Sequence, residues 1–134
     1  MHEELTVKVR FAETDALGHV NNTSYFIYQE EARVEFFGKL GYELNASEWH
    51  FILASTKCDF LSQGYFGQTL AVETTVHRIG TKSFGLTHEI KDKESRTLIA
   101  RGLETIVYFN FHTQQSETVP DSLRAKLEQY LVTA

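Results

Sequence analysis

The chain opens with a regular alternation of apolar and polar residues. The apolar positions are Leu5, Val7, Val9 and Phe11, and polar residues lie between them. A period of two predicts a β-strand that buries one face, so we expect these four side chains to point into a core. Residues 12–21 follow no regular period, which predicts a loop.

From residue 22 onward, the apolar residues recur every three or four positions. They are Tyr25, Tyr28, Ala32, Phe36 and Leu40. This spacing places them on one face of an amphipathic helix. Asn21 or Asn22 is expected to cap the helix at its start, and Gly41 is expected to end it. About 18 residues, or about 27 Å, would make it the longest helix of the protein.

Four segments rich in β-branched and other apolar residues come next. They span 51–62, 69–79, 83–92 and 97–111, with short turns between them. Such short connections favour an antiparallel meander, in which consecutive strands pair. A short helix is predicted after Pro120. This order predicts one α+β domain over residues 1–134, with a sheet packed on one long helix.

Composition narrows the class of protein. Hydrophobic residues make up 42% and charged residues 23% of the chain, which is enough for a core without disulfides or a structural metal. Cys58 is the single cysteine, so no intrachain disulfide forms; with no secretory signal at the start, this favours the cytoplasm. No apolar run approaches the roughly 20 residues that cross a bilayer, so no stable membrane anchor is expected. The net charge of -5 argues against nucleic acid as a partner.

The loop before the long helix contains most of the residues that could take part in catalysis. It contains Asp15, His19, Asn21 and Asn22 next to the helix start. Unpaired backbone N–H groups there favour an oxyanion, and a nearby carboxylate can attack a carbonyl or activate water. Thioesters suit such a site because a thiolate leaves with little or no protonation. The alternative is structural: Asp15 bonds its own turn and the asparagines cap the helix.

Other chemistries lack their motifs. The sequence has no Gly-x-Ser-x-Gly elbow, no phosphate-binding loop and no dinucleotide fingerprint. Its six histidines are scattered without a pair at ligand spacing, so no metal site is expected.

A longer motif resembles a known family. Residues 11–22 read Phe-Ala-Glu-Thr-Asp-Ala-Leu-Gly-His-Val-Asn-Asn, and Tyr25 and the Glu-Glu-Ala-Arg segment 30–33 follow. They resemble the 4-hydroxybenzoyl-CoA thioesterase family of hotdog-fold proteins, most closely its acyl-CoA thioesterase branch. Weaker matches at 78–84 and 100–102 extend the resemblance over nearly the whole chain. It implies a hotdog fold: a five-stranded antiparallel sheet wrapped around one long helix, with a homodimer or homotetramer that shares acyl sites between subunits.

The resemblance also implies roles for particular residues. Asp15 would be the catalytic carboxylate, as nucleophile or general base, and the backbone N–H of Asn22 would polarise the thioester carbonyl. Tyr25 and Glu30 match positions near the site. A related branch has a tyrosine-histidine pair at positions 21 and 22; here the imidazole is His19, which either orients water or Asp15, or packs the loop.

Basic residues are needed for the substrate, because CoA is polyanionic. By position in the family, Arg78, Lys82 and Arg101 would bind its phosphates. Each is also explained as a solvated strand charge, and Glu30 as an ion-pair partner of Arg33, three residues on.

These inferences predict an acyl-CoA thioesterase without a metal or redox cofactor, CoA being part of the substrate. Two alternatives stay open: hydrolysis of acyl groups on an acyl carrier protein, and a hotdog module that binds acyl-CoA without cleaving it. The acyl group itself is not determined by the sequence.

Overall fold

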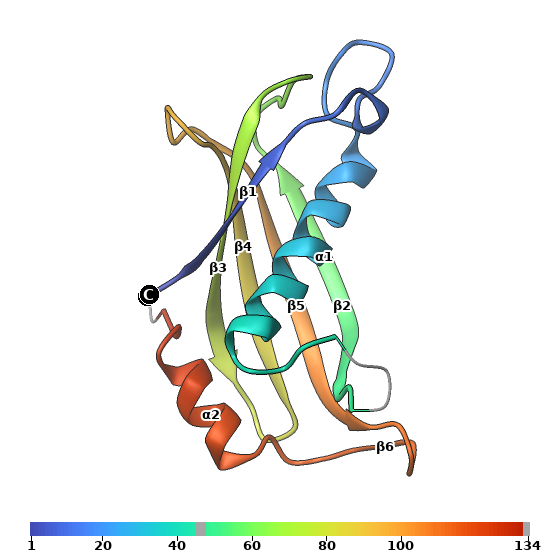
Figure 1. Ribbon diagram of the computed structural model, residues 1–134, viewed down its shortest axis with the longest axis vertical. Coiled ribbons are helices and arrows are strands. Elements are labelled where there is room, and N and C mark those ends of the chain that lie inside the picture. Colours follow the sequence, from blue (N-terminus) through green and yellow to red (C-terminus); the bar gives the residue numbers. More distant parts are fainter. Residues whose placement is uncertain (45–47, 133–134) are drawn as a thin grey trace.

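A sheet wraps around one long helix, as Figure 1 shows. The computed structural model describes residues 1–44 and 48–132. Helix α1 (Asn22–Lys39) crosses the concave face of the sheet, and the shorter helix α2 (Asp121–Glu128) packs near one end. This is the α+β hotdog fold that the sequence predicted. Among the described residues, no helix combines the length and apolar character needed to cross a membrane.

The sheet has five long strands and one short one. They are β1 (Glu3–Lys8), β2 (Phe51–Phe60), β3 (Thr69–Ile79), β4 (Ser83–Asp92), β5 (Leu98–Asn110) and β6 (Gln115–Ser116). All pairs are antiparallel, in the order β1-β3-β4-β5-β2, with β6 on the far end of β5.

The strand order corrects the predicted meander. Strands β3, β4 and β5 do form one, but β2 pairs with β5, and β1 takes the remaining place beside β3. Residues 61–68 connect β2 to β3 across the end of the sheet, where they bond to the loop before α1. A short connection therefore does not require the two strands that it joins to pair with each other; this one bonds to another part of the chain.

The apolar stripe of α1 faces the sheet as predicted. Tyr25, Tyr28, Ala32, Phe36 and Leu40 are all buried, none more than 3% exposed. Their partners are the inward-facing apolar residues of β3, β4 and β5, which alternate along each strand. Each large side chain removed from water in this way contributes about 1.5–3 kcal/mol to the stability of the fold.

One boundary differs from the prediction. Strand β1 ends at Lys8, and residues Phe11–Glu13 form a 3-10 turn, η1. Phe11 is therefore 79% exposed, and the expectation that it lies in the core is wrong. The turn forms because the Glu13 carboxylate accepts a hydrogen bond from the Arg10 backbone N–H, at 2.9 Å, which ends the alternation.

Candidate functional site

The loop before α1 folds back on itself as a tight turn. Thr14 and Val20 form an isolated bridge, and the Asp15 N–H donates to the His19 carbonyl at 2.8 Å. Gly18 has φ +80°, a left-handed conformation that side-chain-bearing residues rarely adopt. The glycine of the motif is thus required for the turn that presents Asp15.

The Asp15 carboxylate is exposed, and its two oxygens differ. Oδ1 accepts hydrogen bonds from the N–H groups of Leu17, at 2.8 Å, and His19, at 3.1 Å. Oδ2 has no hydrogen-bond partner within residues 1–44 and 48–132. Oδ1 therefore stabilises the turn, while Oδ2 is accessible to a substrate or a water molecule. The structural role and the catalytic role expected for Asp15 are thus compatible.

The helix start leaves one backbone donor free. Asn21 caps the helix, because its side chain accepts from the Thr23 N–H at 3.1 Å, and its own N–H donates to the Glu13 carbonyl. The Asn22 N–H, first in the helix, has no protein acceptor in the described part of the chain. With the helix dipole behind it, this N–H is suited to an oxyanion.

Glu13 anchors the loop to the helix, a role that the sequence did not reveal. Its carboxylate also accepts from the Arg10 guanidinium and, at 2.9 Å, from the buried Tyr28 hydroxyl, and its carbonyl accepts from Ser24 Oγ. Burial acts to raise the pKa of Glu13, but the hydrogen bonds from Arg10 and Tyr28 outweigh it, so that pKa lies below its usual value. The Arg10–Glu13 spacing of three was the one available signal.

This anchor predicts a pH-dependent stability. Because the folded pKa of Glu13 is lowered, its charge stabilises the fold above the ordinary value of 4.5, and the contribution is lost as pH falls through the folded pKa. At pH 7, Glu13→Gln should lower the free energy of unfolding by about 1–3 kcal/mol. Denaturation followed from pH 7 to pH 3 should show the difference shrinking; the exposed control Glu31→Gln should stay within about 0.5 kcal/mol throughout. A constant difference would contradict an ionic anchor.

The β2–β3 connection closes over the loop and the helix start. Gly64 accepts from the Val20 N–H at 2.8 Å, and a Cβ on Gly64 would lie 2.8 Å from the Tyr25 hydroxyl, so only glycine fits. The His19 ring packs edge-on against Tyr65, with centroids 5.2 Å apart. The His19 ring therefore helps to pack the loop against the β2–β3 connection. Tyr25 is buried beneath the same connection, next to Gly64.

A small cavity lies at this junction. It measures about 180 Å³, and Val20, Asn22, Tyr25 and residues 60–63 line it. The structure therefore brings together Asn22 and Tyr25 with the end of β2, and Asp15 and His19 lie in the adjoining turn.

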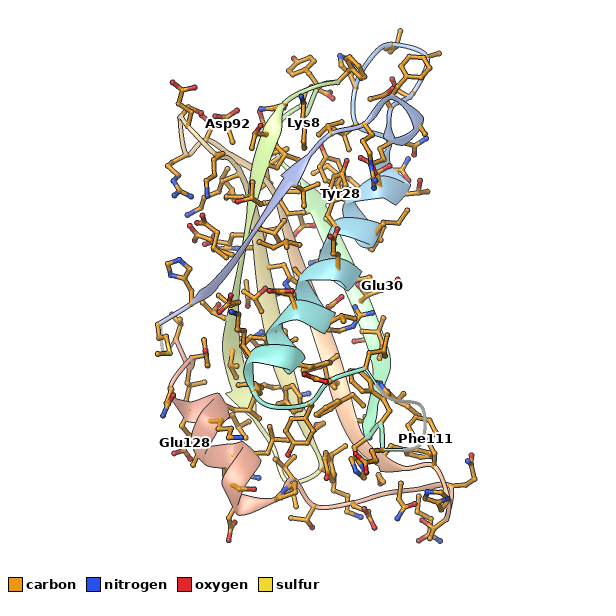
Figure 2. The ribbon with its side chains drawn as sticks, in the orientation of Figure 1. Lys8, Tyr28, Glu30, Asp92, Phe111 and Glu128 are labelled. Atoms are coloured by element: carbon orange, nitrogen blue, oxygen red, sulfur yellow. The ribbon has the colours of Figure 1, made fainter. Side chains whose placement is uncertain are left out.

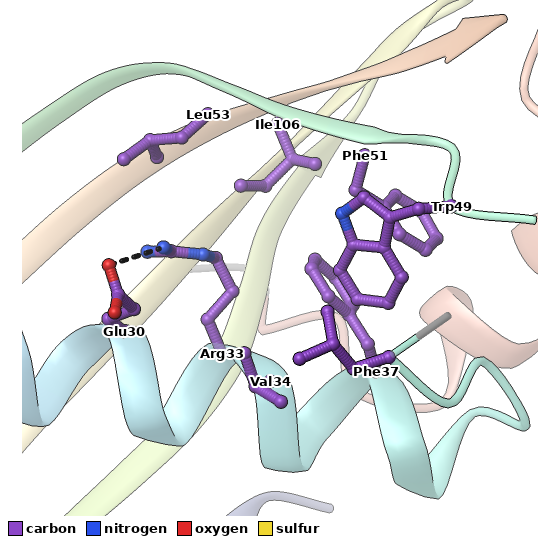
Figure 3. A pocket seen from close by; sticks show the side chains of 9 residues that line it. Glu30, Arg33, Val34, Phe37, Trp49, Phe51, Leu53 and Ile106 are labelled. Atoms are coloured by element: carbon purple, nitrogen blue, oxygen red, sulfur yellow. Dashed lines mark ion pairs between the residues drawn. The ribbon is translucent and has the colours of Figure 1, made fainter. Parts of the chain in front are cut away.

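Glu30 lies farther along α1. It is eight residues from Asn22, about 12 Å along the helix, and Figure 2 shows it at the middle of α1. Its carboxylate is 69% exposed and 3.8 Å from the Arg33 guanidinium, which confirms the proposed ion pair. Both residues border a second cavity of about 260 Å³ whose other walls are mainly apolar, including Phe37, Trp49 and Phe51 (Figure 3).

Arg33 ends a buried polar chain that the sequence analysis missed. Its guanidinium donates to Glu104 at 2.7 Å, Glu104 contacts His88 Nε2 at 2.7 Å, and His88 Nδ1 contacts the Thr74 hydroxyl at 2.8 Å. Glu104 and His88 are almost completely buried. A carboxylate only accepts, so His88 Nε2 carries the proton. In the sequence, the only indication of this chain was that Thr74, His88 and Glu104 occupy inward-facing positions of the predicted strands.

The three basic residues assigned to CoA do not meet within one chain. Arg78 lies nine residues along β3 from Thr69, about 30 Å from the end that carries the Asp15 loop, and Lys82 is in the adjoining hairpin. Arg101, on the outer face of β5, pairs with Glu89 at 2.9 Å. Arg78 and Lys82 would reach an Asp15 site only from another subunit.

Two other reactive groups have structural explanations. Burial, together with the Asp59 charge, raises the pKa of the Cys58 thiol to about 11, so it is not a ready nucleophile. His2, Glu4 and Glu73 lie close enough to share a cation. However, Lys and Arg side chains already pair with both carboxylates, so these ion pairs explain the cluster.

Comparison with known proteins places this geometry in a family. The model of the thioesterase-like superfamily matches residues 9–127. An acyl-CoA thioesterase (YbgC) from Helicobacter pylori is 33% identical over 72 residues. That alignment covers 54% of this chain, and the chain spans only about half (54%) of the first curated relatives' length.

Two solved structures align over almost their full length. A predicted thioesterase from Bacillus stearothermophilus superimposes with a TM-score of 0.92 at 30% identity, covering 100% of this chain and 99% of that one. A Thermus thermophilus thioesterase, solved with coenzyme A and zinc, gives 0.82 at 27% identity, covering 92% and 95%. The family model covers most of the fold and the whole Asp15 loop, so this chain belongs to the thioesterase-like superfamily.

Proposed function

We propose that the protein is an acyl-CoA thioesterase, which converts acyl-CoA and water to a carboxylic acid and CoA. The observation that carries the proposal is that one short loop presents both an Asp15 carboxylate oxygen and an Asn22 backbone N–H that have no hydrogen-bond partner among the described residues. Membership of the superfamily supports the reaction type, and the relatives named for acyl-CoA hydrolysis or solved with coenzyme A support CoA as the carrier.

Each group has a defined part in this mechanism. The Asn22 N–H binds the thioester oxygen and stabilises the negative charge that develops on it. Asp15 Oδ2 either attacks the carbonyl carbon, which gives a mixed anhydride that water then hydrolyses, or removes a proton from the attacking water. Either route expels the CoA thiolate, so a strong general acid is not required. Passive binding without hydrolysis would require Asp15 to be turned away from the acyl site.

The second cavity supports an acyl site at the middle of α1. Its aromatic and aliphatic walls would bind the apolar part of the acyl group, and Glu30 and Arg33 would lie at its edge. An acyl group attached to an acyl carrier protein remains the alternative substrate to acyl-CoA. Both substrates would place the same acyl group in this cavity.

A hydrolysis screen tests the proposal. The wild type should release thiol from at least one of a set of short, medium, long and aromatic acyl-CoAs, with the Asp15→Asn protein as the control for contaminating hydrolases. Acyl groups loaded on an acyl carrier protein form the second arm. Preference for the carrier protein would favour the alternative, and no thiol release in either arm would contradict the function.

We also propose that the active protein is a homodimer or homotetramer. Strand β2 lies at a sheet edge. Its own Leu53 and Phe60, Leu61 directly after it, and Ile27 on α1 are apolar and 39–57% exposed. Exposed edges and apolar patches of this kind are usually covered in a native assembly.

The assembly predicts a mass in solution above that of one chain. Light scattering at micromolar concentration should give the mass of two or four chains. Ile27→Lys, which places a charge on the exposed face of α1, should shift the protein toward monomer and lower its activity. A fully active wild-type monomer would contradict a site shared between subunits.

A further inference from the structure

The acceptor oxygens of Glu13 are all occupied by hydrogen bonds from the protein. Its carboxylate accepts four, from the N–H, Nε and Nη2 of Arg10 and from the Tyr28 hydroxyl, at 2.8–3.0 Å. Its carbonyl accepts two, from the Asn21 N–H and from Ser24 Oγ, both at 2.9 Å. A carboxylate offers about four acceptor positions and a carbonyl two. Glu13 therefore has no acceptor left for a substrate or a water molecule.

These bonds connect the two sides of the loop that presents the catalytic groups. Glu13 closes the 3-10 turn η1, two residues before Asp15, and its carboxylate holds that turn in place. Tyr28 lies on α1 within the core, in the half of the helix nearer the loop, so its hydroxyl bonds the turn to the helix itself (Figure 2). The Glu13 carbonyl bonds instead at the helix start, to the residue before Asn22 and to the Ser24 hydroxyl after it. One residue thus joins the Asp15 side of the loop to the Asn22 side.

The same contacts determine which donor stays free at the start of α1. The first N–H groups of a helix have no partner within the helix. Here the Asn21 N–H donates to the Glu13 carbonyl. The Thr23 N–H donates to the Asn21 side chain at 3.1 Å, and the Ser24 N–H donates to the Asn21 carbonyl at 2.9 Å. Of these four consecutive groups, the Asn22 N–H alone has no acceptor within residues 1–44 and 48–132, and Asn22 lines the cavity beside the loop.

We propose that Ser24 and Tyr28 are positioning residues for thioester hydrolysis. Acting through Glu13, they fix the placement of the Asp15 carboxylate relative to the Asn22 N–H. Both side chains are buried, at 3% and 1% exposed, and both hydroxyls donate to Glu13 rather than to a substrate. A misplacement of about 1 Å in a catalytic group can cost about a hundredfold in rate, so this connection contributes to kcat. The inference rests on the proposed function for the reaction itself.

Deleting each hydroxyl alone tests the proposal. Tyr28→Phe keeps the ring, which packs edge to face against Tyr25 with centroids 6.2 Å apart. Ser24→Ala places a strong helix former in α1, so both variants should fold. Each change should lower kcat at least about fivefold and leave KM within about twofold, because the displaced groups act mainly in the transition state.

The matched controls remove the same hydroxyls elsewhere. Tyr130 is buried and packs edge to face against Phe36, and Ser122 lies in the first turn of α2. Tyr130→Phe and Ser122→Ala should keep kcat within about twofold of the wild type, even where the thermal midpoint falls. Normal kcat in both Tyr28→Phe and Ser24→Ala, or a loss confined to KM, would overturn the proposal.

A double-mutant cycle distinguishes positioning from general damage to the fold. In an Asp15→Asn background no carboxylate is left to position, so adding Tyr28→Phe should lower the residual kcat less than about twofold. A merely structural defect would lower kcat by the same factor in both backgrounds, which would contradict a role that acts through Asp15.

Hydrogen exchange provides a readout that needs no substrate. Exchange over residues 12–24, followed by mass spectrometry, should be faster in Tyr28→Phe and Ser24→Ala than in the wild type, while exchange over α2 should be unchanged. Unchanged exchange in the loop would overturn the Glu13 connection. If the loop loosens but the wild type hydrolyses no thioester, the connection stands and the proposed activity fails. If the wild type is active and both variants match it, the activity stands and the positioning role fails.

Discussion

Replacing Asp15 by asparagine should lower kcat at least about a hundredfold, the low end for loss of an acid–base group, and more if the carboxylate is a nucleophile. KM should change little, because the charge acts mainly in the transition state. The fold should survive, since the asparagine Oδ1 can still accept from the Leu17 and His19 N–H groups. Steady-state kinetics and the thermal midpoint are measured on the same protein.

The matched control is Asp121→Asn, an exposed aspartate in the first turn of α2 that should leave turnover unchanged. Near-normal kcat with a lowered thermal midpoint in Asp15→Asn would show that Asp15 only stabilises its turn. Such a result would remove the chemical role while leaving the fold assignment intact.

Isotope labelling tests the nucleophilic role of Asp15. Wild-type protein turns over substrate once in oxygen-18 water, and the protein and the released acid are analysed by mass spectrometry. If a mixed anhydride forms and water attacks its aspartyl carbon, one labelled oxygen enters the Asp15 carboxylate, which identifies Asp15 as the nucleophile. Label found only in the released acid is expected if Asp15 activates water, and also if water attacks the acyl carbon of the anhydride.

Neutralising Glu104 should cause the largest loss of stability. Glu104→Gln removes the buried carboxylate 2.7 Å from the Arg33 guanidinium, which leaves Arg33 only the exposed Glu30 at 3.8 Å, and it disrupts the bond to His88 inside the core. Removing one partner of a buried ion pair costs about 3–5 kcal/mol, because the other charge stays desolvated. Urea denaturation at a fixed protein concentration measures this loss, since an oligomer's stability depends on concentration.

The matched control is Glu89→Gln, on the neighbouring strand and the outer face of the sheet. Its carboxylate pairs with Arg101, whose side chain is 51% exposed, so we expect a loss of less than about 1 kcal/mol. Equal stability of Glu104→Gln and the wild type would mean that the buried chain from Thr74 to Arg33 does not act as a unit.

The sequence by itself determined the features that depend on near neighbours in the chain. The three-and-four spacing from Tyr25 to Leu40 defined α1 and its buried face, since residues at those spacings are neighbours on a helix. The order of strands and turns was sufficient for the two-layer fold. The Asp15 loop was also visible, because its glycine, carboxylate and capping asparagine lie within seven residues.

Only the tertiary structure decided the features that depend on contacts between distant segments. Strand β2 pairs with β5 rather than β3, and the 61–68 connection between β2 and β3 is bonded instead to the Asp15 loop. The buried chain joins α1 to β3, β4 and β5, so no local pattern links Arg33 to Glu104, 71 residues later.

The separation of Arg78 from Asp15, and the exposure of Phe11 beside Phe66, likewise follow from the packing of whole strands. Sequence spacing determines which side chains share a face of one element. Which elements pack against each other depends on many weak contacts between residues far apart in the sequence, and these contacts form only in the folded chain.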